Sequence, residues 1–416
     1  MNLLKTSFLS GISTLIRTIS SLVLTKVIAI YIGPSGMAII GQLQNFINIV
    51  MLSAGNFLKT AVTKYTAEYK EDKEVKYDIW SASVKIILSL NLIIFFPLFF
   101  FSEEISQLLL NETKYAYVLK VFAISLPFFV LNTLLLSILN GHKQIKKYIT
   151  LQIALSILSL ILVVLLSIFF GLYGALFAYV TNQSIVFLFT FFYLKKESWF
   201  EVKNFTRKIK LENIKKLSGY ALITIVAVLS SNSSMLLIRD FISEEASLVE
   251  AGYWQAIWSL SQISLNMITL SLTTYYLPTM AALIKKKEIT KELKKTFKTI
   301  FPIVFIISLA IFFLREFIVL ILYTEEFLPM VDLFFWQMMG NVVKVTAWLF
   351  GYILVAKAMV KYTTLSEVFL AITFVLMTFF LVKKYGIIGA TYSYLINSFF
   401  HLIMMVYIYK FKVKDE

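Results

Sequence analysis

The chain has 416 residues, of which 59% are hydrophobic, 16% are aromatic and only 15% are charged. This composition excludes a soluble globular protein, in which about 25% of residues are charged. The absence of Cys excludes a disulfide framework, and two His leave little for a zinc site or for acid–base chemistry. We therefore expect an all-α polytopic membrane protein without a metal or cofactor, and not an enzyme.

Apolar segments long enough to cross a bilayer follow one another along the chain. We predict twelve transmembrane helices at residues 8–31, 39–62, 79–101, 115–140, 149–170, 172–194, 217–239, 251–277, 299–322, 328–355, 362–382 and 386–409. All the loops between them are short, the longest being a basic linker at 196–215. No soluble domain is expected.

The basic residues lie mainly in alternate loops. If the N-terminus is cytoplasmic, the inside segments hold 28 of the 39 Lys and Arg residues, the outside loops hold 3, and 8 lie within the predicted spans. Cytoplasmic loops of membrane proteins are enriched in Lys and Arg, so this asymmetry predicts an N-in, C-in topology. The net charge of +15 therefore belongs to membrane loops, and we expect no nucleic-acid partner.

The first predicted span carries Arg17 near mid-depth, on the same face as Ser13 and Ser20. A cation at the centre of a lone span costs about 2.5–3.5 kcal/mol, so we expect Arg17 to face a polar cavity or a partner. Only four of the 39 basic residues are Arg, and Arg17, Arg239 and Arg315 lie in or at spans. The planar guanidinium binds phosphate with two parallel hydrogen bonds, which suggests an anion site.

Further polar side chains fall on single faces of other predicted spans. Amides and cations in hydrocarbon cost several kcal/mol unless they meet polar partners. We therefore predict that spans 1, 2, 7 and 8 line one wet cavity, while interhelical hydrogen bonding in a tight bundle is the alternative. The candidate substrate-binding residues are Arg17, Lys59, Arg239, Lys344, Asn45, Asn48, Gln262 and Asn266.

Two acidic residues inside the predicted spans are candidates for binding a coupling ion. Asp332 belongs to the tenth span and Glu367 to the eleventh. Each could equally be paired structurally with a neighbouring helix.

The second half of the chain repeats the first. Residues 171–182 read GLYGALFAYVTN and residues 386–397 read GIIGATYSYLIN, which share the pattern GxxGAxxxYxxN at an offset of 215. The repeat predicts two six-helix lobes in the same orientation, at 1–195 and 216–416, joined by the linker 196–215. Parallel repeats of this kind occur in transporters, with the substrate path between the lobes.

The opening 70 residues resemble a known family. The GPSG turn at Gly33 to Gly36, the Gln- and Asn-rich second span and the VTKYTAEY segment at 62–69 are similar to O-antigen and enterobacterial common antigen flippases. These form the polysaccharide branch of the multidrug/oligosaccharidyl-lipid/polysaccharide exporter superfamily. The resemblance implies a V-shaped bundle with a cationic central cavity. By alternating access it would move an undecaprenyl-diphosphate-linked oligosaccharide to the outer leaflet of the bacterial inner membrane, for lipopolysaccharide-type surface polymers.

The same resemblance also indicates which partners and which alternative functions to consider. It implies contacts with membrane lipids, leaves contact with other polysaccharide-assembly proteins open, and favours a monomer. A cation-coupled multidrug exporter of the same superfamily is the first alternative, although the first two spans contain no Asp or Glu before Glu68. A membrane enzyme of polysaccharide assembly is the second, and the sequence offers it neither a nucleophile nor a metal cluster.

Overall fold

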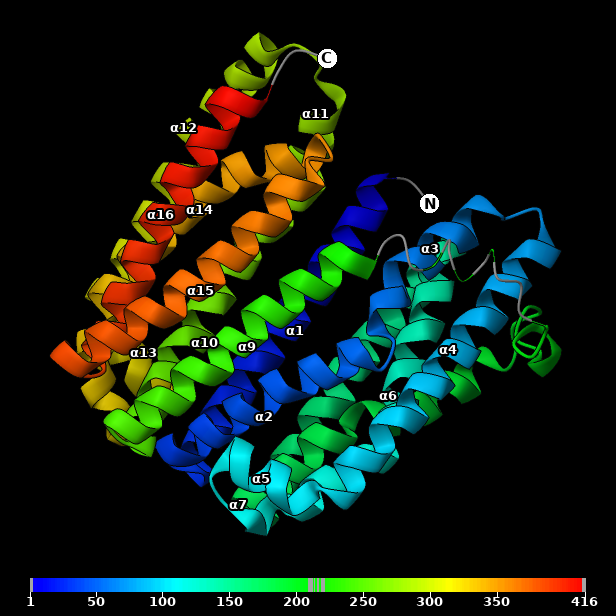
Figure 1. The fold of residues 1–416 in the computed structure, drawn as a ribbon, viewed down its shortest axis with the longest axis horizontal. Helices are drawn as coiled ribbons and strands as arrows, with labels where there is room; N and C mark the ends of the chain where they lie inside the picture. Colours follow the sequence, from blue (N-terminus) through cyan, green and yellow to red (C-terminus); the bar gives the residue numbers. More distant parts are fainter. Residues whose placement is uncertain (1–2, 209–211, 213, 215–216, 218–220, 414–416) are drawn as a thin grey trace. The chain divides into compact units, whose positions relative to one another are not determined.

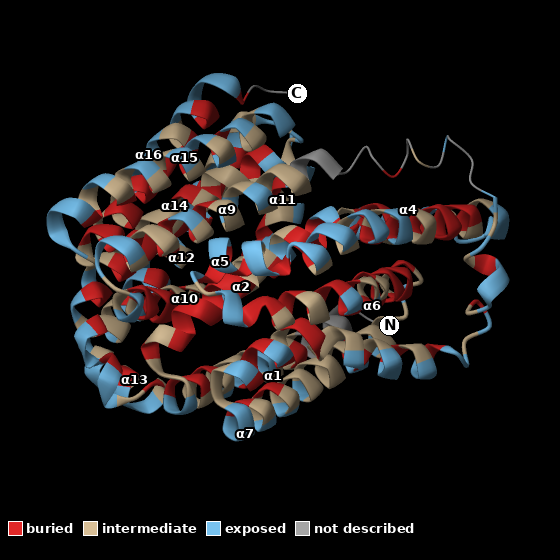
Figure 2. Cartoon of the chain, turned by 60° about the horizontal axis from the view of Figure 1, so that its bottom comes forward, coloured by how far each residue is buried: buried red, intermediate tan, exposed pale blue. Residues whose placement is uncertain are grey.

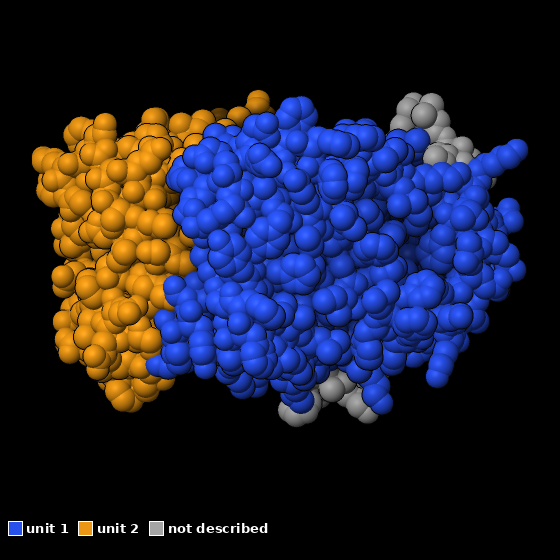
Figure 3. Space-filling model, turned by 90° about the horizontal axis from the view of Figure 1, so that it is seen from below, with its two compact units in different colours: residues 1–32, 42–228 blue, residues 33–41, 229–416 orange. Residues whose placement is uncertain are grey.

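The computed structural model describes residues 3–208, 212, 214, 217 and 221–413. Within these residues all the regular elements are helices (Figure 1). The chain forms two compact units, which we call unit 1 (residues 1–32 and 42–228) and unit 2 (residues 33–41 and 229–416) (Figure 3). The helix α2 contributes to both units, since its first residues belong to unit 2 and the rest to unit 1.

The helices of the first part of the chain are α1 (Leu3–Tyr31), α2 (Gly33–Ser53), η1 (Asn56–Leu58), α3 (Lys59–Glu68), α4 (Lys73–Phe100), α5 (Ser102–Leu110), η2 (Thr113–Tyr115), α6 (Ala116–Gly141), α7 (Ile145–Leu194) and η3 (Val202–Asn204). Those of the second part are α9 (Ala221–Glu245), α10 (Leu248–Ser271), η4 (Leu272–Tyr276), α11 (Leu277–Ala282), α12 (Lys286–Phe313), α13 (Arg315–Leu322), η5 (Glu325–Leu333), α14 (Phe334–Ala356), α15 (Val360–Tyr385) and α16 (Ile388–Lys412).

Ten helical segments in the described part of the chain are long and apolar enough to cross a membrane. The 50-residue α7 counts as one of them but contains a break at Gly171, between the predicted spans 149–170 and 172–194. The helix α10 is not among the ten. Many large apolar side chains are exposed, such as Ile93 and Phe100 on α4, and Figure 2 shows exposed residues along the outer faces of the helices. Exposed apolar surface of this extent fits contact with lipid tails.

The second predicted span is not one continuous helix. The expected helix over 39–62 ends at Ser53, and the chain resumes as η1 and α3. At the break Gly55 has φ 123°, which L-residues rarely adopt, and a Cβ atom there would lie 2.7 Å from the Ile87 side chain. The Asn91 amide on α4 donates to the Ala54 carbonyl at 2.9 Å, which satisfies a backbone group freed by the break.

Unusual backbone conformations recur at the offset of the sequence repeat. Gly171 has φ 56° and Gly386 has φ 64°, while Lys143 has φ 56° and Ala358 has φ 49°. The members of each pair are 215 positions apart. The turn at Lys143 therefore has the same backbone form as the turn at Ala358, and the break at Gly171 has the same form as the one at Gly386.

Gly171 allows a clean test of this backbone requirement. At φ 56°, ψ −138° the residue occupies a region that is essentially restricted to glycine, and a Cβ atom would meet nothing within 4 Å. Gly171→Ala should therefore destabilise the protein by about 1–3 kcal/mol through backbone strain alone. The measurement is thermal unfolding in detergent.

The matched control is Gly11→Ala, in the helix α1, where a Cβ atom also meets nothing within 4 Å but no positive φ is present. This change should be neutral or slightly stabilising, because Ala favours helix. Equal effects of the two substitutions would contradict the assignment of strain to Gly171.

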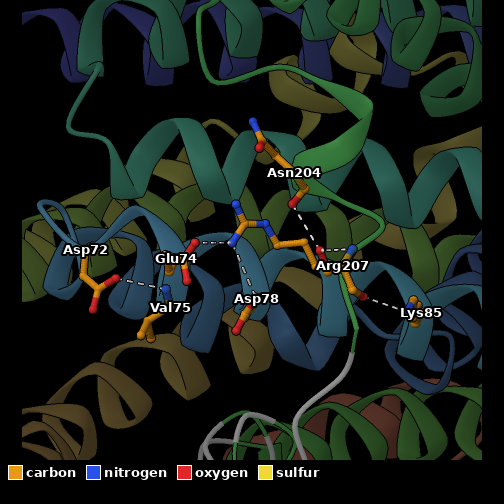
Figure 4. A network of polar contacts seen from close by, with 8 residues as sticks. Asp72, Glu74, Val75, Asp78, Lys85, Asn204 and Arg207 are labelled. Carbon is orange, nitrogen blue, oxygen red and sulfur yellow. Dashed lines mark hydrogen bonds and ion pairs between the residues drawn. The ribbon is translucent and has the colours of Figure 1, made fainter.

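The first part of the predicted linker packs against α4 in unit 1 (Figure 4). The Arg207 guanidinium lies 3.7 Å from both Glu74 and Asp78, and the Lys85 ammonium donates to the Arg207 carbonyl at 2.7 Å. The Ser81 hydroxyl donates to the Asn204 carbonyl at 3.1 Å and accepts from the Arg207 amide at 3.0 Å. Residues 204–207 are thus fixed to α4 by backbone as well as side-chain contacts.

An aromatic cluster joins the same segment to the helix ends. The rings of Trp80, His142 and Trp199 lie 5.4–5.6 Å apart in pairs, and Trp80 donates to the Thr66 hydroxyl at 2.9 Å. The Nε2 atom of His142 is buried without a hydrogen-bond partner in the described part of the chain. Burial, and after it the nearby Lys76 charge, lower the pKa of His142 from 6.5 to about 4.

The lowered pKa of His142 predicts a loss of stability in acid. The unfolded chain takes up this proton near pH 6.5 and the folded chain only near pH 4, so the unfolded state binds more protons between these values. Stability should therefore fall as the pH drops from about 6.5 to about 4. Thermal unfolding in detergent across this range measures the effect. His142→Phe keeps the ring contacts and should flatten the profile; an unchanged profile would show that His142 is not responsible.

Candidate functional site

Unit 1 contains a polar cavity of about 270 Å³. Its lining includes four amide side chains, Asn48, Asn56, Gln152 and Gln183, and the hydroxyl of Tyr148. These residues come from α2, η1 and both halves of α7, so the break at Gly55 and the break at Gly171 both shape the site. The cavity is therefore built from segments far apart in the sequence.

Lys59 supplies the cation of this cavity. It is exposed, and it stands at the first residue of α3, directly after the break in the second predicted span. No carboxylate lies within ion-pair distance of Lys59 among the residues that the structure describes. The structure thus brings two predicted site residues, Asn48 and Lys59, to one cavity.

Arg17 and Asn45 do not line the unit 1 cavity. Arg17 is exposed on α1, whereas Ser13 and Ser20 on the same face are buried. No ion pair to Arg17 is present in the described part of the chain, and α1 itself contains no Asp or Glu. Asn45 is half-buried on α2. Arg17 is thus a cation in an apolar helix with no carboxylate within ion-pair distance among the described residues.

Arg239 lies in a different setting, inside unit 2. Arg239 is only 3% exposed, and its Nε and Nη2 donate to the side-chain oxygen Oε1 of Gln255 at 3.1 and 2.5 Å. The guanidinium lies 5.8 Å from the centre of the Trp254 ring, within the range of a cation–π contact. Gly41 packs against Gln255, since a Cβ atom there would lie 2.5 Å from the amide. Arg239 is therefore surrounded by protein groups.

Unit 2 has a second cavity, of about 190 Å³, whose lining includes Glu367 and His401. Lys344 is half-buried on α14, lies 5.4 Å from the centre of the Tyr394 ring, and interacts electrostatically with both Glu367 and His401. A carboxylate, an imidazole and an ammonium group thus come together in one part of unit 2.

The remaining predicted residues lie on the surface of unit 2 or near it. Gln262 is half-buried and Asn266 is exposed, both on α10. Asp332 is exposed in η5, before α14 begins, so it does not join Glu367 at the unit 2 cavity.

Sequence reasoning missed Gln152, Gln183 and His401. The predicted cavity was assigned to the first, second, seventh and eighth spans. Gln152 and Gln183 lie on α7, which covers the fifth and sixth predicted spans, and His401 lies on α16, the twelfth. A polar amide or imidazole inside a strongly apolar helix was the available signal.

Open cavities with polar and charged side chains, set among membrane-capable helices, are typical of a membrane transporter. The described residues contain no cluster of three or more potential metal ligands. Solved structures agree on the fold. An inward-facing multidrug resistance transporter of the MATE family, in the MOP superfamily, has a TM-score of 0.81 at 14% identity, covering 95% of this chain and 94% of its own. The lipid II flippase MurJ in an inward closed conformation has a TM-score of 0.74 at 15% identity, covering 98% and 87%.

The sequence places the chain within one family. The family model described as "Polysaccharide biosynthesis protein" matches residues 3–284, and the chain belongs to this family. The chain is also 26% identical over 395 residues to proteins named lipid III flippase from Escherichia coli K12 and Shigella flexneri, covering 95% of each chain.

Proposed function

We propose that this protein is a flippase that moves a lipid-linked oligosaccharide across the membrane for the assembly of a cell-surface polysaccharide. The observation that carries the proposal is the similarity to the lipid III flippases over 95% of both chains. The shared fold with MurJ supports it, and the family relationship agrees with polysaccharide biosynthesis. These relatives are transporters, and the protein is a transporter rather than an enzyme.

The charges of the site suit such a substrate. A lipid diphosphate carries negative charge that hydrocarbon does not solvate, whereas its polyprenyl tail can remain in lipid. In this proposal Arg17 and Lys59, with Lys344 in unit 2, supply positive charge to the path, whereas the buried Arg239 holds Gln255 and supports the fold. The amides of Asn45, Asn48, Gln262 and Asn266 contact sugar hydroxyls. Binding has to be modest, because the substrate must be released on the other leaflet.

We assign ion coupling to Glu367 in preference to Asp332. Glu367 lines a cavity with His401 and interacts with Lys344, so its protonation or ion binding would change the charge of a whole cluster. Both carboxylates are exposed, but Asp332 lies in η5 and lines neither of the two cavities.

The proposal includes twelve spans in two parallel lobes at 1–195 and 216–416, an N-in, C-in topology in the bacterial inner membrane, and a monomer. Because the chain has no Cys, single Cys residues at Glu245 and Glu326 should react with an impermeant thiol reagent from outside, and those at Lys146 and Lys291 should not. Two successive loops that label on the same side would contradict the topology.

Deletion of the gene tests the function. Cells without it should accumulate the intact lipid-linked oligosaccharide, which mass spectrometry of extracted lipids would identify. If the protein were a multidrug exporter, its deletion would instead raise the sensitivity of the cells to drugs and leave these lipids unchanged. A truncated or chemically altered glycan would indicate an enzyme and would overturn the proposal.

A further inference from the structure

The unit 1 cavity has the chemical character of a hydrogen-bonding site, in which neutral amides surround a single cation, Lys59. Asn48, Asn56, Gln152 and Gln183 present amides that both donate and accept, and Tyr148 adds a hydroxyl and an aromatic face. Among the described residues the cavity lining contains no Asp or Glu. A cationic drug or a metal ion would lack a counter-charge here, whereas a sugar ring offers hydroxyl groups to the amides and an apolar face to the aromatic ring.

One buried polar atom in this cavity lacks a partner from the protein. The Oδ1 atom of Asn56 is buried and has no hydrogen-bond partner in the described part of the chain. Buried polar atoms are almost always satisfied, so an orphaned acceptor in a polar cavity points to a ligand or water that donates to it. A sugar hydroxyl is such a donor.

The volume of the cavity indicates how much of a glycan fits within it. A volume of about 270 Å³ corresponds to roughly nine water molecules at about 30 Å³ each. This space exceeds what one pyranose ring needs, whereas a whole oligosaccharide with its diphosphate would extend beyond it. The cavity therefore suits a single sugar unit of a longer chain.

The cavity in unit 2 is lined from the same positions of the sequence repeat as the cavity in unit 1, but with different residues. Thr133 and Trp348, Leu136 and Gly351, Tyr148 and Thr363, and Gln152 and Glu367 are each 215 positions apart, and every pair contributes one residue to each cavity. Where unit 1 has the neutral Gln152, unit 2 has the carboxylate Glu367. The unit 1 cavity, which has no acidic residue in its described lining, thus differs in chemistry from the unit 2 cavity, which has one.

We propose that the unit 1 cavity is a subsite for one sugar ring of the lipid-linked glycan, held by Asn56, Gln152 and Gln183, with Tyr148 against its apolar face. Lys59 adds positive charge beside this ring. The inference rests on the proposed flippase function and extends it, because it separates recognition of the glycan at the unit 1 cavity from recognition of the diphosphate by Arg17, which does not line that cavity.

Binding measurements on the full chain in lipid nanodiscs test the subsite. The two ligands are the glycan-bearing lipid extracted from cells that lack this gene, and undecaprenyl diphosphate without a glycan. Gln152→Leu and Gln183→Leu remove hydrogen-bonding groups at nearly constant volume. Each should weaken binding of the glycan-bearing lipid about fivefold and leave binding of undecaprenyl diphosphate unchanged.

The matched control is Gln107→Leu, because Gln107 is exposed on α5 and does not line the cavity. It should leave both affinities unchanged, and thermal unfolding of all three variants shows that they are folded. Unchanged binding of the glycan-bearing lipid in both cavity variants would overturn the subsite, and so would an equal loss for both ligands. If the unaltered protein binds neither lipid, the proposed function itself fails.

Discussion

Arg17→Ala is expected to lower the rate of substrate transport ten- to a hundredfold while the protein still inserts and accumulates normally. Arg17 is exposed on α1, that helix carries no acid, and no ion pair to it is present in the described residues. In our proposal its partner is the substrate diphosphate, and a charge-assisted hydrogen bond contributes about 1.5–3 kcal/mol. The measurement is the amount of surface polysaccharide, normalised to membrane protein level.

Two further substitutions at Arg17 separate charge from geometry. Arg17→Lys should keep part of the activity, because it preserves the charge and loses the bidentate fork. Arg17→Glu should be inactive, since a carboxylate repels the diphosphate. Full activity of Arg17→Glu at normal abundance would contradict an anion site at Arg17, and low abundance of Arg17→Ala would indicate a structural role instead.

Arg239→Ala is expected to have its main effect on stability. The buried guanidinium donates two hydrogen bonds to Gln255, and hydrogen bonds to charged groups contribute about 1.5–3 kcal/mol. The substitution removes these bonds, leaves the Gln255 amide without them, and opens a cavity beside Trp254. Thermal unfolding in detergent should show a clear fall in the melting temperature.

Arg315→Ala is the matched control, because Arg315 is half-buried and donates to the Phe312 carbonyl of the preceding turn. Its effect on stability should be smaller. The double variant Arg239→Met with Gln255→Leu should recover part of the loss, since it removes both polar partners together. A normal melting temperature of Arg239→Ala, together with lost transport, would instead place Arg239 in the substrate path.

The all-helical membrane fold followed from the sequence because the length of its apolar segments is a strong signal. Composition required membrane helices, and the pattern around Gly174 and Gly389 identified the repeat whose backbone turns recur in the structure at Gly171 and Gly386. These features depend on local residues, so they can be read without knowing which helices touch.

The arrangement of the site was harder to predict because it depends on breaks and on contacts between helices. Helical periodicity treated 39–62 as one rod, but Gly55 interrupts it, and the surface that Lys59 shares with Asn48 is completed by α6 and α7. The burial of Arg239 against Gln255 likewise depends on how α9 packs with α10. Neither contact can be predicted from the helical periodicity of a single sequence.

Reconstitution into liposomes tests the central claim most directly. The purified protein is incorporated with the glycan-bearing lipid, and an enzyme that attacks the glycan and does not cross the bilayer is added outside. In liposomes without the protein only the outer leaflet should be accessible, whereas with the protein nearly all of the lipid should become accessible. Arg17→Glu should behave like the protein-free liposomes. Equal accessibility with and without the protein, when the protein is folded and the lipid is intact, would contradict flippase activity.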